Sequence, residues 1–211
     1  MTDTFPSPAG DAAQHPTRGP HTHPIASPVA PPVARPTWRF LCNHPAHWLA
    51  LGGGSGLSPV APGTVGTLWA WLAFAALDPW VDTAHWLAAI GLGTLVGWWA
   101  CTRTARDLGK ADPSEVVWDE VLAFWLVLAV LTPASFTLQA IAFGVFRFFD
   151  AAKPGPVGWA DQLFKARDPD HPGAPPGIGW AQGWGILFDD FVAAGCTLLT
   201  LAAGLALWRA W

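Results

Sequence analysis

The stretch that decides the fold class covers residues 84–102, which read AHWLAAIGLGTLVGWWACT. It contains no Asp, Glu, Lys or Arg, and three further gaps, 40–77, 121–146 and 191–208, are equally free of charge. A helix needs roughly 20 mostly apolar residues to cross a bilayer. The gaps therefore predict an all-α, membrane-embedded bundle of about five long helices, over residues 64–79, 84–102, 117–132, 135–150 and 189–208. The alternative is a helical bundle that only sits on a membrane, with these helices as its core.

The composition agrees with a membrane protein. Of the 211 residues, 52% are hydrophobic and only 12% are charged, whereas about a quarter are charged in an ordinary soluble domain. The chain has 15 Trp and no Tyr, and Trp is enriched at bilayer boundaries. The net charge is −4 with no basic stripe, so nucleic acid is not an expected partner. Cys42, Cys101 and Cys196 form no CxxC pair, which makes a disulfide framework or a zinc site unexpected.

The N-terminal segment differs from the rest. Residues 1–38 hold nine of the 21 prolines and almost no large apolar side chains. Such a segment cannot bury enough surface to fold, so we expect a disordered, Pro-rich tail over 1–38 and a helical membrane domain over 39–211. The segment starts with an acidic residue, Asp3, and has no apolar run, unlike a secretory signal.

The basic residues predict an orientation. If the tail is cytoplasmic, only Arg209 of the 11 Lys and Arg residues falls on the outer side. This distribution follows the positive-inside rule.

Local signals mark the helix ends. Asp112 followed by Pro113 predicts a capped helix that opens at Pro113, and Gly109 suits the end of the preceding helix. Lys153-Pro154-Gly155-Pro156 should stop the fourth helix. Residues 166–183 hold four prolines and four glycines and predict a long loop. Three glycines are expected to let helices approach closely: Gly91, Gly93 and Gly97.

The acidic residues converge in this topology. Helix starts, a helix end and a following segment bring six of them to the cytoplasmic rim: Asp119, Glu120, Asp150, Asp161, Asp189 and Asp190. So many carboxylates cannot ionise together without a cation, and Mg²⁺ prefers hard oxygen ligands and phosphate. The alternative is that acids at helix starts simply favour the positive helix end. That would explain Asp119, Glu120, Asp189 and Asp190, but not Asp150 at a C-terminus.

Two further features suit a phosphate ligand. Arg147 lies one helical turn before Asp150, and Lys153 follows at the helix exit; both could bind a phosphate oxygen. The alternative is that these basic residues only form a plain ion pair and a positive-inside anchor. Residues 52–66 are rich in Gly and hydroxyl groups, including Ser55, Ser58 and Thr64, and precede a helix N-terminus, which favours anions. The alternative is that residues 52–66 form a flexible re-entrant connection.

Four ordered motifs resemble the phosphatidylglycerophosphatase A family over roughly residues 50–200. They are Gly54-Ser55-Gly56-Leu57-Ser58-Pro59 with Ala61-Pro62-Gly63-Thr64 and Gly66-Thr67; Asp112–Glu120; Phe146–Asp150 with Lys153-Pro154 and Pro156; and Gly183, Gly185, Asp189 and Asp190 with Ala193 and Gly195. The chain departs from the family at Ala152 and Gly155, where aromatic residues are usual, and by about 15 extra residues over 166–181.

The resemblance implies an all-helical, Mg²⁺-dependent phosphatase of the bacterial inner membrane, with its active site on the cytoplasmic face. It would convert phosphatidylglycerophosphate into phosphatidylglycerol and inorganic phosphate. The implied catalytic and Mg²⁺-binding residues are Asp119, Glu120, Asp150, Asp189 and Asp190, and the implied substrate-binding residues are Ser55, Ser58, Thr64, Arg147, Lys153 and Asp161.

Several alternatives stay open at this stage. The nucleophile is either a metal-bound water or an aspartate, with one or two metal ions, and the sequence does not give the oligomeric state. Another membrane phospholipid-headgroup enzyme, such as an alcohol phosphatidyltransferase, would also need clustered acids, although its spaced DG…AR…G…D…D pattern is absent. A non-enzymatic transporter with an acidic ion site is the remaining class.

Overall fold

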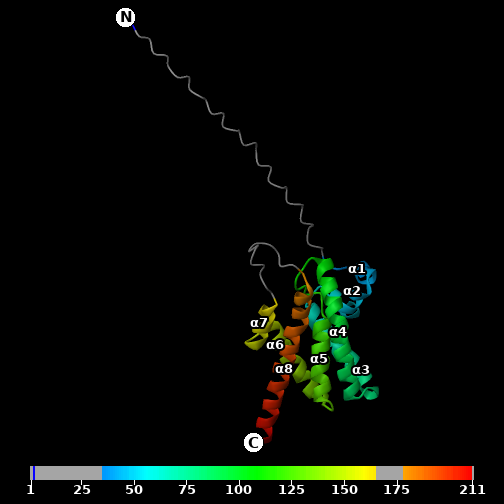
Figure 1. The fold of residues 1–211 in the computed structure, drawn as a ribbon. Coiled ribbons are helices and arrows are strands. Elements are labelled where there is room, and N and C mark those ends of the chain that lie inside the picture. Colours follow the sequence, from blue (N-terminus) through cyan, green and yellow to red (C-terminus); the bar gives the residue numbers. More distant parts are fainter. Residues whose placement is uncertain (1, 3–34, 165–177, 211) are drawn as a thin grey trace. The chain divides into compact units, whose positions relative to one another are not determined.

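The computed structural model describes residues 2, 35–164 and 178–210 (Figure 1). The predicted tail over 1–38 and the predicted loop over 166–183 therefore lie largely outside the described residues, and the tail ends earlier than predicted, because Trp38 already begins a helix. Within the described ranges the chain forms helices and no strand, so the all-α prediction is confirmed. The elements are α1 (Trp38–Asn43), α2 (Pro45–Ala50), the 3₁₀ helix η1 (Gly52–Leu57), α3 (Pro62–Leu77), the 3₁₀ helix η2 (Asp78–Trp80), α4 (Thr83–Leu108), α5 (Trp118–Leu131), α6 (Phe136–Ala152), α7 (Pro156–Leu163) and α8 (Trp180–Ala210).

The five predicted long helices are present as α3, α4, α5, α6 and α8. Two of them, α4 with 26 residues and α8 with 31 residues, are long and apolar enough to cross a membrane. At 1.5 Å per residue they extend about 39 Å and about 46 Å, beyond the roughly 30 Å of the hydrocarbon core. Helices α3, α5 and α6 have 16, 14 and 17 residues and are shorter than a usual span.

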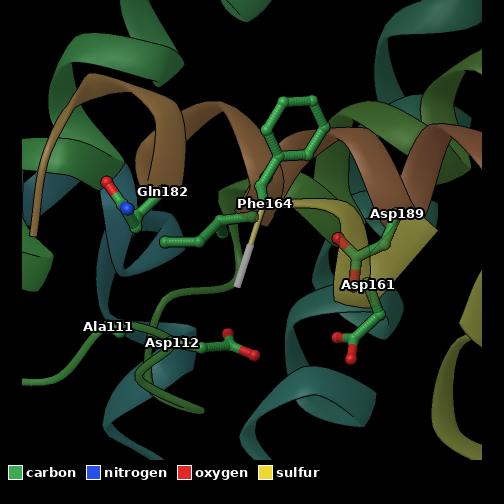
Figure 2. Close-up of a pocket in the computed structure, with 8 residues that line it drawn as sticks. Ala111, Asp112, Asp161, Phe164, Gln182 and Asp189 are labelled. Carbon is green, nitrogen blue, oxygen red and sulfur yellow. The ribbon is translucent and has the colours of Figure 1, made fainter. Parts of the chain in front are cut away.

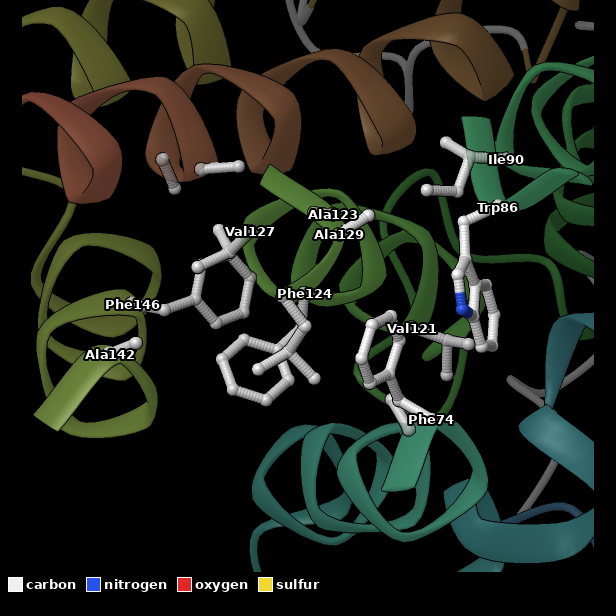
Figure 3. Packing of buried hydrophobic residues seen from close by; sticks show 14 of the residues in the cluster. Phe74, Trp86, Ile90, Val121, Ala123, Phe124, Val127, Ala129, Ala142 and Phe146 are labelled. Atoms are coloured by element: carbon white, nitrogen blue, oxygen red, sulfur yellow. The ribbon is translucent and has the colours of Figure 1, made fainter. Parts of the chain in front are cut away.

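Helix α5 is the centre of the bundle and packs against α3, α4 and α8, which surround it (Figure 1). After Asp119 and Glu120 in its first turn, its sequence is apolar on every face, as expected for a helix enclosed by others. Phe124 and Val127 are fully buried and lie near Phe146 of α6 (Figure 3). On the other side, the rings of Phe74 and Trp86 stack with centroids 4.4 Å apart. Close packing of this kind fixes where the first turn of α5 lies.

The start of α5 differs from the prediction. The helix begins at Trp118 and not at Pro113, because residues 112–117 form a bend and a turn followed by two residues without regular structure. The Val116 N–H donates to Pro113 O over 2.9 Å, but the next donor, Val117 N–H, bonds Ala50 O of α2 over 2.9 Å. A contact with α2 thus replaces the predicted first turn. The end of α4 at Gly109, with a φ of 66°, is as predicted.

The start of α8 also differs, since the helix begins at Trp180, inside the predicted loop. Two bonds tie this end to the last turns of α4. Trp98 Nε1 donates to Trp180 O over 2.7 Å, and Arg106 Nε donates to Ile178 O over 2.8 Å. Helices α4 and α8 are therefore antiparallel, and Asp189 and Asp190 lie in the third turn of α8, not at its start.

The glycines of α4 divide into two groups. A Cβ on Gly93 would lie 2.7 Å from Leu122 Cδ2, and a Cβ on Gly97 would lie 2.5 Å from Trp118 Cδ1. These two glycines allow α4 to approach α5, as predicted. The prediction for Gly91 is wrong, because a Cβ there would meet open space.

Candidate active site

An acidic cavity of about 320 Å³ lies where the start of α3, the 112–116 link, the start of α5, the end of α6 and the third turn of α8 meet. The structure brings together seven of the predicted site residues on its wall: Asp119, Glu120, Arg147, Asp150, Lys153, Asp189 and Asp190. With Asp112, six carboxyl groups and two basic groups line the cavity, so carboxyl groups outnumber bases by four. We refer to it below as the acidic cavity.

Arg147 holds one side of the acidic cavity. Its Nη1 donates to Glu120 Oε1 of α5 over 3.3 Å, to Thr67 Oγ1 of α3 over 3.4 Å, and to Asp150 one turn along α6. Glu120 is also close to α3, because a Cβ on Gly63 would collide with its Oε1. One guanidinium therefore joins three helices around the cavity. This arrangement confirms the predicted proximity of Arg147 and Asp150. The guanidinium of Arg147 is also suited to bind a phosphate oxygen.

Lys153 holds the other side. It caps the C-terminus of α6 in a left-handed conformation, with a φ of 45°. Its Nζ donates to Asp189 Oδ2 of α8 over 2.6 Å and to Asp161 of α7. Partial burial opposes the charged amine, but the two carboxylates outweigh this effect and raise the pKa of Lys153 above its usual value. Lys153 is therefore a permanent cation at neutral pH.

Three carboxylate oxygens in the acidic cavity fit a cation that the protein does not itself supply. Asp119 Oδ1, Glu120 Oε2 and Asp190 Oδ2 are buried and have no hydrogen-bond partner. Leaving a charged oxygen buried and unpartnered is costly, and hard oxygen donors are the ligands that Mg²⁺ prefers. Across residues 35–164 and 178–210, no three His, Cys, Asp or Glu side chains are already grouped around one point as in a formed metal site.

The helix-end explanation does not apply to two of these acids. The effect of the positive helix end fades within the first turn. Asp189 and Asp190 are 6% and 3% exposed and lie in the third turn of α8. Asp119 and Glu120 do lie in the first turn of α5, so that explanation stays open for them.

The hydroxyl groups predicted to bind substrate lie elsewhere. Ser55 Oγ donates to Gly52 O over 3.0 Å, and Ser58 Oγ donates to Val60 O over 2.8 Å. Neither they nor Thr64 are on the wall of the acidic cavity. The hydroxyl that accepts a bond from Arg147 belongs to Thr67, which is part of the first sequence motif but was not predicted to bind substrate. Thr67 lies four residues after Gly63 on the same face of α3, and this spacing could have indicated that its hydroxyl lies near the site.

A smaller side chamber of about 140 Å³ opens beside the acidic cavity and shares Asp112, Ile186 and Asp189 with it. Figure 2 shows Asp161 and Asp189 close together, away from Gln182 and Phe164. Asp161, predicted to bind substrate, thus lies in this chamber, where it contacts Lys153.

Carboxylates, an arginine and a lysine around one cavity, in a bundle with two helices long enough to cross a membrane, suit a membrane-associated enzyme that handles phosphate. Comparison with known proteins identifies the family to which such an enzyme belongs. The family model for phosphatidylglycerophosphatase A matches residues 48–168. The phosphatidylglycerophosphatase A of Escherichia coli (strain K12) is 35% identical over 74% of this chain and 80% of its own length. That of Haemophilus influenzae is 34% identical over 72% of this chain and 83% of its own length.

The chain therefore belongs to the phosphatidylglycerophosphatase A family, as the motifs predicted. It is an enzyme that hydrolyses phosphate monoesters, and the transporter alternative is set aside. No solved structure matches the chain.

Proposed function

We propose that this protein removes the terminal phosphate of phosphatidylglycerophosphate in a Mg²⁺-dependent reaction of glycerophospholipid biosynthesis, giving phosphatidylglycerol and inorganic phosphate. The names of the two relatives support this substrate. The observation that carries the proposal is the acidic cavity, where buried, unpartnered carboxylate oxygens face the basic side chains of Arg147 and Lys153.

The predicted ligands fit Mg²⁺. Asp119, Glu120, Asp150, Asp189 and Asp190 would hold the metal, since all five line the acidic cavity and three of them contribute unpartnered oxygens. When bound, Mg²⁺ supplies positive charge that stabilises the phosphoryl group as its negative charge redistributes.

Arg147 and Lys153 would bind and orient the phosphate. Both are on the cavity wall, and each already engages two carboxylates. An arriving phosphate can take over N–H donors from those carboxylates, and charge-assisted bonds of this type are strong and directional. The ion pairs also keep the two cations in place before substrate arrives.

We also propose a multi-pass protein of the bacterial inner membrane, with the acidic cavity at the cytoplasmic face. The antiparallel pair α4 and α8 supports this orientation, because Arg103, Arg106 and Lys110 lie at the cavity end while Arg209 ends α8. The excess of basic residues at the cavity end agrees with the positive-inside rule. A substrate could then keep its acyl chains in the bilayer while its headgroup enters the cavity.

The test is phosphate release from phosphatidylglycerophosphate by the full-length protein in detergent, with Mg²⁺ and with chelator. Release should require Mg²⁺ and should fall to background in Asp119→Asn. Asp82→Asn is the matched control: Asp82 caps α4 outside the acidic cavity, and Asn caps helices as well as Asp does. Wild-type protein that is folded and Mg²⁺-loaded but releases no phosphate would overturn the proposed substrate. Equal release with chelator would overturn the metal.

A further inference from the structure

Besides the side chamber, another cavity, of about 60 Å³, adjoins the acidic cavity. Its wall includes Arg35, Ser58 and Glu115, and it shares Pro62 and Ser114 with the acidic cavity. The two shared residues place the two spaces next to each other. We call this space the Arg35 cavity.

Arg35 is directed across this space by the turn that follows η1. Its Nη1 donates to Pro59 O over 3.1 Å, which uses one of the five N–H donors of a guanidinium. The turn itself is fixed by the bond from Ser58 Oγ to Val60 O. Ser58, predicted from sequence to bind phosphate, therefore positions the carbonyl that orients Arg35.

The charge of the Arg35 cavity suits an anion. Glu115 is the acidic group on its wall, and Lys110 Nζ donates to Glu115 Oε1 over 2.8 Å, which offsets the carboxylate. Arg35 and Glu115 balance on the wall itself, and Lys110, which lies behind Glu115, brings the sum of the three charges to +1, with Glu115 Oε2 left without a hydrogen-bond partner. The side chamber is lined by three carboxyl groups and no basic residue. Lys153 bonds two of these carboxyl groups, Asp161 and Asp189, which still leaves an excess of negative charge that would repel an anion.

We infer that the Arg35 cavity binds the internal phosphodiester of the lipid whose terminal phosphate enters the acidic cavity. The inference rests on the proposed function. That substrate carries two phosphate groups joined by one glycerol unit, so the two groups must bind in neighbouring spaces. A guanidinium matches phosphate oxygens in two-point geometry, and Ser114 adds a hydroxyl at the boundary. Arg35 is thus a specificity residue that distinguishes this lipid from simpler phosphate monoesters.

The experiment compares Arg35→Gln with two matched variants in detergent micelles. Arg39→Gln removes the same charge from an exposed position on α1, and Gln182→Leu alters the side chamber. Two inhibitors separate the cavities: phosphatidylglycerol keeps the phosphodiester but lacks the terminal phosphate, and inorganic phosphate represents the terminal group alone.

Arg35→Gln should raise both the KM for phosphatidylglycerophosphate and the inhibition constant of phosphatidylglycerol about tenfold, the effect of losing one charged hydrogen bond. The kcat and the inhibition constant of inorganic phosphate should not change, and Arg39→Gln should behave like wild type. Arg35→Gln kinetics equal to those of Arg39→Gln, or an equal loss of phosphate inhibition, would overturn the inference. The same effects in Gln182→Leu would place the phosphodiester in the side chamber. Absence of hydrolysis by the wild type would instead overturn the proposed function.

Discussion

Lys153 Nζ donates to Asp189 Oδ2 over 2.6 Å, and this bond joins the C-terminal cap of α6 to the third turn of α8. The two residues are 36 positions apart in sequence, and the residues between them include the 165–177 segment that the structure does not describe. The geometry of the acidic cavity therefore depends on a lysine that also has an unfavourable backbone conformation, with a φ of 45°.

Substitution of Lys153 separates these two properties. Lys153→Ala and Lys153→Gly both remove the bonds to Asp161 and Asp189, so both should lose most activity. Glycine adopts a left-handed conformation freely, whereas alanine pays about 1 kcal/mol. Lys153→Gly should therefore be the more stable of the two by about 1 kcal/mol, or roughly 2–4 °C in Tm for a chain of this size. Thermal unfolding in detergent measures the difference. A Tm for Lys153→Gly at or below that of Lys153→Ala would contradict the conformational argument.

Asp190 should limit stability when no divalent cation is bound. It is 3% exposed, and its Oδ2 has no hydrogen-bond partner. Asp190→Asn removes one carboxyl group from a cavity in which carboxyl groups outnumber bases by four, so the metal-free variant should be about 1 kcal/mol more stable than the metal-free wild type. Mg²⁺ should raise the Tm of the wild type and of Asp82→Asn but not that of Asp190→Asn, and the last should be inactive. If Mg²⁺ stabilises Asp190→Asn as much as the wild type, Asp190 is not a metal ligand.

The number and type of long helices could be predicted because charge is unfavourable in a bilayer and its absence leaves long gaps in the sequence. Local stop signals were equally direct at Gly109 and Lys153. The starts of α5 and α8 could not be predicted, since each depends on a distant partner. Val117 N–H bonds Ala50 O, and the peptide oxygens of Ile178 and Trp180 accept bonds from side chains of α4.

The candidate site divides in the same way. Acidic and basic residues could be identified because ionisable side chains at membrane depth are energetically costly and are therefore usually functional. Hydroxyl groups were not, since a serine or threonine can bond its own local backbone. Ser55 and Ser58 do so, and Thr67 also donates to the local backbone, at Gly63 O, but in addition accepts a bond from Arg147.

Gly63 is predicted to be essential for activity. A Cβ at this position would collide with Glu120 Oε1 and would lie 3.1 Å from Arg147 Nη2. Gly63→Ala should displace both side chains, and misplacement of this size can cost on the order of 100-fold in kcat/KM. Gly144→Ala on α6 is the control, because a Cβ there would meet nothing within 4 Å. Phosphate-release kinetics of the two variants give the comparison, and similar rates would show that the contact is not needed.

Helix packing between α4 and α5 provides a separate stability test. Gly97→Ala would place its Cβ 2.5 Å from Trp118 Cδ1 and should destabilise the protein by about 1–3 kcal/mol, the usual cost of overpacking. Gly91→Ala faces open space on the same helix and should be slightly stabilising, because alanine favours helix more than glycine does. Thermal unfolding of both variants measures the two effects. Equal changes in Tm would mean that α4 and α5 do not approach at Gly97.

The proposed orientation can be tested with a native thiol. Cys42 is exposed on α1, and α2, which follows α1, is tied to the last turn of α4 by the 2.8 Å contact between His47 Nε2 and Asp107 Oδ2. Trp208 is 82% exposed in the last turn of α8, at the other end of that helix from Ile178. One protein would keep Cys42 with Cys101→Ala and Cys196→Ala, and a second would carry Trp208→Cys with all three native cysteines replaced by alanine.

A membrane-impermeant maleimide should label Cys42 only in inverted membrane vesicles and the position-208 thiol only in intact cells, because the acidic cavity is expected at the cytoplasmic face. Both thiols should react in detergent, which controls for accessibility. Labelling of Cys42 in intact cells would reverse the orientation. Labelling of both thiols from the same side would mean that α8 does not cross the membrane, and that the bundle sits on its surface instead.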